Sequence, residues 1–95
     1  STEINGDLYV ALAPAAQALR ARHPLAAVML WRAMIEVALD RGQAFRYALA
    51  AEYLAECAAA EGDLTGDTDL LDHDSYVQSL QARFGHVSSF WKKLR

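Results

Sequence analysis

The stretch Leu25–Leu39 constrains the fold most, because it is apolar around almost its whole circumference. Its polar residues are Arg32 and Glu36, and together with Asp40 they recur every four positions. Residues spaced in this way share one narrow stripe of an α-helix. A helix that is apolar on nearly all sides must be covered on several of them. We therefore expect this helix to lie inside a helical array and not on its surface.

A second helix is expected from about Ala44 to Ala60, folded back on the first through the turn at residues 40–43. Pro24 suits the first position of the first helix, and Gly42 marks its end. Apolar residues of the second helix recur at spacings of three and four: Tyr47, Ala50, Ala51, Leu54, Cys57 and Ala58. Its many alanines permit close approach of the two helix axes. Phe45, Leu49 and Tyr53 lie off this stripe, which indicates a second contact surface for the N-terminal helix or for another chain.

These patterns predict an all-α fold with four to five helices around a central antiparallel helical hairpin. Residues 1–13 are expected to form an N-terminal arm or short helix, because Pro14 disfavours helical dihedrals before it and removes a backbone donor. Asp72 is a plausible N-cap, and Gly85 occupies the expected C′ position of the helix that follows. Residues 14–95 then form a single all-α domain with helices at about 14–22, 24–41, 44–61, 73–84 and 87–94.

Composition and charge disfavour several classes of protein. The 95 residues are 54% hydrophobic and 22% charged, as in an ordinary globular domain. No run of eighteen uncharged apolar residues is present, so we expect no membrane span. The single cysteine, Cys57, lies on an apolar stripe, which fits a reduced, buried thiol in a cytoplasmic protein. The net charge is −3, and no part of the chain makes the broad basic face that duplex nucleic acid requires.

The acidic segment 61–74 is the one stretch that resembles a metal-binding loop. An EF-hand-like reading would take its oxygen ligands from Asp63, Thr65, Asp67, Asp69 and Asp74. The pattern fails at three positions. Thr68 stands where the sharp turn needs Gly, Leu71 occupies the ninth place, and Asp74 stands where the last ligand should be Glu. We interpret this segment as a solvated loop that ends in a helix cap.

The histidines and serines give no stronger signal for chemistry. His23, His73 and His86 include no pair at i, i+4 spacing, so a zinc site is not expected. Ser88 lies beside His86 without a nucleophile elbow or an oxyanion loop, so we interpret Ser88 as the N-cap of the last helix. We therefore expect no catalytic residue, no cofactor and no metal.

Three segments resemble the C-terminal helical part of an uncharacterised bacterial family of unknown function: His23–Ala27, Leu30–Met34 and Phe45–Leu54. The closing pattern of that family is similar to the end of this chain at Asp72, His73, Tyr76, Leu80, Arg83, Gly85, Phe90 and Trp91. The resemblance covers about residues 23–94. It implies tetratricopeptide-like helical packing and, in some members, an N-terminal SWIM-type zinc finger. It implies no activity.

The functional hypothesis is a protein–protein interaction or scaffolding module that binds a protein partner or forms a homodimer, without direct contact to nucleic acid or membrane. Its basis is the surplus of apolar surface on both arms of the predicted hairpin. The interface candidates are Leu30, Trp31, Met34, Phe45, Leu49 and Tyr53. Two alternatives stay open: a helical accessory domain of a nucleic-acid-associated zinc-finger protein, which rests on the resemblance, and a small enzyme with a site around His73, His86 and the acidic loop.

Overall fold

The computed structural model describes residues 18–64 and 70–94, and every regular element in these ranges is helical. The prediction of an all-α fold is therefore confirmed. Residues 18–22 are helical, and the later elements are α2 (Pro24–Asp40), η1 (Ala44–Arg46), α3 (Tyr47–Ala60), η2 (Glu61–Asp63), α4 (His73–Phe84), α5 (Ser88–Trp91) and η3 (Lys92–Leu94). The arm predicted at 1–13 and the break predicted at Pro14 lie outside the described residues.

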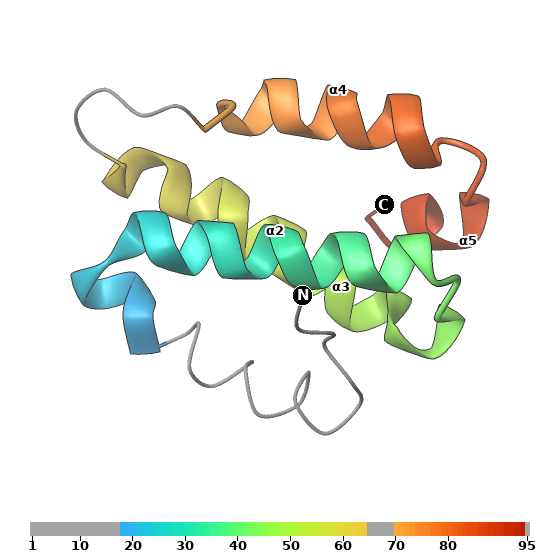
Figure 1. Ribbon diagram of the computed structural model, residues 1–95, viewed down its shortest axis with the longest axis horizontal. Coiled ribbons are helices and arrows are strands. Elements are labelled where there is room, and N and C mark those ends of the chain that lie inside the picture. The colour runs from blue at the N-terminus through green and yellow to red at the C-terminus, as the bar shows by residue number, and fades with distance from the viewer. Residues whose placement is uncertain (1–17, 65–69, 95) are drawn as a thin grey trace.

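Helix α2 begins at Pro24 and ends in a turn that requires glycine. Gly42 adopts a left-handed backbone conformation with φ of +62°. Its N–H donates to the carbonyl of Leu39 at 3.2 Å, and the N–H of Gln43 donates to the carbonyl of Ala38 at 2.9 Å. These two bonds form a Schellman motif, which satisfies carbonyls that the helix end would otherwise leave open. The turn reverses the chain, so α2 and α3 run antiparallel (Figure 1).

The backbones of α2 and α3 approach closely, whereas α4 makes few close backbone approaches to any other helix. Small side chains explain the first observation, since the buried residues of the α2–α3 pair include Ala27, Ala38, Ala50, Ala51 and Ala60. The helix predicted at 44–61 differs at its start, because residues Ala44–Arg46 form a 3₁₀ turn. The N–H of Arg46 bonds to the carbonyl of Gln43 at 2.8 Å, which tightens this first turn.

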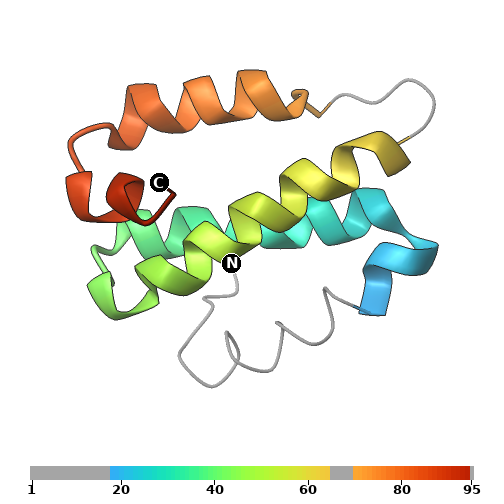
Figure 2. The ribbon, with the colours of Figure 1, turned by 180° about the vertical axis from the view of Figure 1, so that it is seen from behind.

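The core is formed by large side chains that fill the space between the helices. Those with almost no exposure are Trp31, Phe90, Met34, Ile35, Leu80, Val28 and Cys57. Seen from behind in Figure 2, α5 covers the end of the α2–α3 pair at which α3 begins. Phe90 of α5 inserts there, with its ring centroid 6.2 Å from that of Tyr47 in an edge-to-face arrangement.

The start of α4 is fixed by two carboxylates. Asp72 is the N-cap, as predicted, and its side chain accepts a hydrogen bond from the N–H of Ser75 at 3.1 Å. Glu61 of η2 accepts from the N–H of His73 at 2.7 Å. Together these bonds satisfy two of the backbone donors that a helix start leaves open. Glu61 thereby links the end of α3 to the start of α4.

Two predictions about the connection between α4 and α5 need correction. Gly85 is the C-cap of α4 and not the predicted C′ residue, and its φ of −59° lies outside the left-handed region that is usual at C′. A Cβ at this position would lie 2.5 Å from the carbonyl oxygen of Gln81, so close approach of backbone, and not a positive φ, requires glycine here. The predicted N-cap role of Ser88 is wrong, because Val87 is the N-cap of α5 and makes no side-chain capping bond.

Candidate functional site

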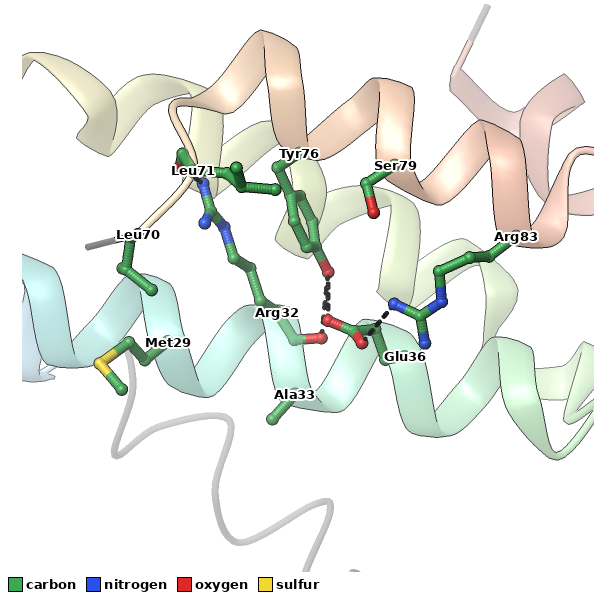
Figure 3. A pocket seen from close by; sticks show the side chains of 9 residues that line it. All are labelled: Met29, Arg32, Ala33, Glu36, Leu70, Leu71, Tyr76, Ser79 and Arg83. Atoms are coloured by element: carbon green, nitrogen blue, oxygen red, sulfur yellow. Dashed lines mark hydrogen bonds and ion pairs between the residues drawn. The ribbon is translucent and has the colours of Figure 1, made fainter. Parts of the chain in front are cut away.

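The narrow polar stripe of α2 faces α4 and forms the floor of the candidate site (Figure 3). Arg32 is only 6% exposed, although it carries a full positive charge. Its Nη2 donates to the backbone carbonyl of Leu71 at 2.8 Å. Its guanidinium carbon lies 4.2 Å from the centroid of the Tyr76 ring, which is a cation–π contact. Arg32 therefore joins α2 to the segment just before α4 and to the first turn of α4 itself.

Glu36 lies one helical turn further along α2 and binds two side chains of α4. The hydroxyl of Tyr76 donates to its Oε2 at 2.9 Å, and Nη1 of Arg83 pairs with its Oε1 at 2.9 Å. The backbone carbonyl of Arg32 also lies 3.3 Å from the Tyr76 hydroxyl. Burial and the charge of Glu36 raise the pKa of Tyr76, so the hydroxyl keeps its proton and acts as a donor. The α2–α4 contact is thus a connected polar network.

A groove of about 600 Å³ runs along this contact, and we call it the α2–α4 groove. It is lined by Met29, Arg32, Ala33, Glu36, Leu70, Leu71, Tyr76, Ser79 and Arg83. Figure 3 shows Met29, Leu70 and Leu71 at one end, and Glu36 with Arg83 at the other. Met29 is 53% exposed and Leu71 is 50% exposed, so this end offers apolar surface to a ligand. The groove exists because long side chains, and not close backbone packing, connect α4 to α2.

The charges that line the groove do not balance. Two guanidinium groups, on Arg32 and Arg83, face one carboxylate, on Glu36. Within the described ranges no carboxylate lies at ion-pair distance from Arg32, and its buried Nε has no hydrogen-bond partner. The pKa of Asp72 is lowered mainly by the hydrogen bonds that its side chain accepts from Ser75, and the positive charge of Arg32 makes a smaller contribution. The groove therefore has a surplus positive charge beside an apolar end.

The structure separates the predicted interface residues into three groups. Trp31, Met34 and Tyr53 are buried, so a partner does not reach their side chains within this fold. Leu30 and Leu49 are half-buried and pack against the core. Phe45 is 78% exposed at the turn between α2 and α3, with the guanidinium of Arg46 5.0 Å from its ring centroid. None of these six residues lines the α2–α4 groove.

The residues considered for chemistry are dispersed. His23 lies before α2, His73 begins α4, and His86 follows α4. Burial raises the pKa of the Cys57 thiol to about 12, which favours the protonated form at neutral pH. In the described residues no group of three or more His, Cys, Asp or Glu side chains could hold a metal ion. Thr65, Asp67 and Asp69 of the acidic loop lie outside those residues.

Sequence reasoning identified Arg32 and Glu36 as a stripe but missed the groove residues of α4. Tyr76 and Arg83 enter the sequence analysis only through the family resemblance, which assigns them no role in a site. The signal that could have found them is the combination of a buried polar stripe on α2 with polar side chains on the helix that covers it.

Within the described ranges, no helix has the length and apolarity needed to cross a bilayer.

The comparison with protein families gives one assignment. Residues 1–93 match DUF6880, a family of unknown function. The chain therefore belongs to this family, in agreement with the resemblance to a family of unknown function. No curated protein and no solved structure is significantly similar to the chain. The tetratricopeptide-like packing and the zinc finger implied by the resemblance stay predictions.

Proposed function

We propose that this domain is a protein-interaction module that binds its partner in the α2–α4 groove. The observation that carries the proposal is the exposure of Met29 and Leu71 beside the buried Arg32, which has no carboxylate at ion-pair distance among residues 18–64 and 70–94. Apolar side chains next to an arginine form the composition that protein interfaces favour. The volume of about 600 Å³ suits a few side chains of a partner and not a whole domain.

The proposal also includes where the module is located and how its helices are packed. Cys57 is a free, buried cysteine, and burial raises the pKa of its thiol. A reduced cysteine of this kind suits a cytoplasmic protein. The family resemblance adds a bacterial source and tetratricopeptide-like packing within a longer helical array. In such an array the closely packed α2–α3 pair supplies the rigid support, and α4 supplies one wall of the binding groove.

Site-specific photo-crosslinking in cells tests the proposal. A photoreactive benzoylphenylalanine would replace Met29 or Ser79 in the groove and, as matched controls, the exposed residues Gln78 on α4 and Ala59 on α3. We expect one defined protein to crosslink from the two groove positions and not from the controls. Equal crosslinking from all four positions, or crosslinking from the controls alone, would contradict the proposed site.

A binding measurement with the crosslinked partner completes the test. Ala33 and Ala26 are both exposed alanines of α2, but only Ala33 lines the groove. A bulky side chain at Ala33 would fill the groove, so Ala33→Phe should weaken binding by about tenfold or more. Ala26→Phe should leave the affinity unchanged. The same loss in both variants would show that the groove is not where the partner binds.

Self-association is the second version of this function, and Phe45 supports it. It is the one predicted interface residue that is strongly exposed in the structure. If Phe45 lies in a homodimer interface, light scattering should give a mass above 10.5 kDa that rises with concentration, and Phe45→Ser should return the protein to a monomer. A strict monomer at high concentration removes the homodimer version and leaves the groove proposal intact.

A further inference from the structure

We infer that the partner segment bound in the α2–α4 groove carries an Asp or Glu side chain close to an aliphatic side chain, and that Arg83 binds the carboxylate. This inference rests on the proposed function and specifies the chemistry of the ligand. It commits to a side-chain carboxylate within a peptide. A free C-terminal carboxylate is a different ligand that the experiment below separates from it.

The charge of the groove is unbalanced. Arg32 is nearly buried and has no carboxylate at ion-pair distance in the described ranges. A buried charge without an opposite partner is unfavourable, and its field is screened less than that of an exposed charge. An anionic group in the groove would therefore be attracted by Arg32 as well as by the group that it contacts directly.

Arg83 has N–H donors beyond the one that Glu36 accepts. Its side chain is 50% exposed, and Glu36 occupies only Nη1. A guanidinium has five N–H donors in a planar fork, and a carboxylate can accept two of them in parallel. Glu36 is already held by Tyr76 and Arg83, so its own charge is satisfied. Arg83 is thus placed to bind a second carboxylate at the polar end of the groove.

The other end of the groove is apolar. Met29, Leu70 and Leu71 lie there, and a methionine side chain adapts its shape to different aliphatic groups. Met29 and Glu36 are seven residues apart on α2, which is about 10 Å along a helix axis. The acidic and the aliphatic side chain should therefore lie within about two helical turns of each other in the partner. One surplus charge is too small a basis for binding to a nucleic-acid backbone.

Selection from a displayed library of twelve-residue peptides, fused at both ends so that no terminus is free, tests the inference. The wild-type protein is the target, and the groove-filled Ala33→Phe variant removes peptides that bind elsewhere. We expect enriched peptides to combine Asp or Glu with Leu, Ile, Val or Met. Absence of enrichment over Ala33→Phe, or enriched peptides without an acidic residue, would overturn the inference.

Charge variants then test the role of Arg83 with selected peptides, made with acetylated and amidated ends. Arg83→Gln should weaken binding by about tenfold, because it removes a charge-assisted contact. Arg22 is exposed and lies outside the groove, so Arg22→Gln makes the same change in net charge and should have little effect. Glu36→Gln should strengthen binding, because it removes the negative charge beside the bound carboxylate. Thermal unfolding of each variant verifies that it is folded.

Equal weakening by Arg83→Gln and Arg22→Gln would overturn the specific contact. Binding only of peptides with a free C-terminal carboxylate would overturn the choice of a side-chain carboxylate. The inference and the proposed function can fail separately. A partner that crosslinks from Met29 through a segment without Asp or Glu would contradict the inference and leave the proposed function standing. Failure of the crosslinking itself would remove the proposed function.

Discussion

The two faces of α2 are built in different ways. On one side α3 packs against it at short backbone distance, with buried alanines and an apolar core. On the other side α4 is held further away by long polar side chains, with Arg32, Tyr76, Glu36 and Arg83 in one network. Close packing of apolar groups favours stability, whereas a polar contact between separated helices leaves room for a ligand. One helix can thus serve as a structural support and as the floor of a binding groove.

The largest effect is expected in the apolar core. Trp31 is 1% exposed, so Trp31→Ala leaves a cavity as well as losing buried apolar surface. We expect it to lower the free energy of unfolding by about 3–5 kcal/mol, measured by urea denaturation. Leu25→Ala is the control, because Leu25 is partly exposed on the same helix and its truncation should cost much less. Similar losses in the two variants would contradict the view that the core carries the stability.

The second prediction compares how accessible a cysteine thiol is in the core and in the α2–α4 groove. Cys57 is buried, and burial raises its pKa to about 12, so alkylation of the native protein should be very slow at neutral pH. Leu71→Cys in a Cys57→Ala background places a thiol at an exposed position of the groove. We expect this thiol to react on the order of a hundredfold faster than Cys57, measured with iodoacetamide. Comparable rates would mean that the core opens as readily as the groove.

The third prediction concerns the polar network. Tyr76→Phe removes the hydroxyl that donates to Glu36 and leaves the ring on Arg32 in place. We expect a loss of about 1–2 kcal/mol in the free energy of unfolding. The matched double variant with Glu36→Gln should lose less than the sum of the two single variants, because both changes affect the same hydrogen bond. Additive losses would show that the hydrogen bond contributes little to the docking of α4.

The smallest effect is expected at the N-cap of α4. Hydrogen bonds from Ser75 hold the pKa of Asp72 below its ordinary value of 3.8. A carboxylate with a lowered pKa in the folded state stabilises the protein above its unfolded pKa, and this contribution is lost as the pH falls through the folded pKa. Asp72→Ala should therefore lower the Tm slightly at pH 7. The difference from wild type should shrink below about pH 3.8; a constant difference would contradict this cause.

Much of the fold could be predicted because its signals are local. The helix at 73–84 follows from Asp72 and from an apolar period, and the end of α2 follows from Gly42. The error at Ser88 has the same local origin, since a serine before a short apolar stripe resembles an N-cap, although the chain turns one residue earlier. Local patterns therefore locate helices well and their ends less well.

The candidate site could be predicted only in part, because it depends on contacts between distant residues. Arg32 and Glu36 were visible as a stripe, but their partners Leu71, Tyr76 and Arg83 lie about forty residues further along the chain. The periodicity of a helix does not reveal which neighbour covers each face. For the same reason, an apolar face predicts burial without deciding between the core and an interface, and the three aromatic and methionine candidates Trp31, Met34 and Tyr53 lie in the core.

The central claim is that the α2–α4 groove binds an acidic and aliphatic peptide segment. The most direct test is an NMR titration of the ¹⁵N-labelled protein with an amidated peptide from the selection. We expect chemical-shift changes to concentrate at the amides of Met29, Ala33, Leu70, Leu71 and Ser79, and to vanish in Ala33→Phe. Changes that concentrate on α3 or α5, with the groove amides unmoved, would contradict binding in the groove.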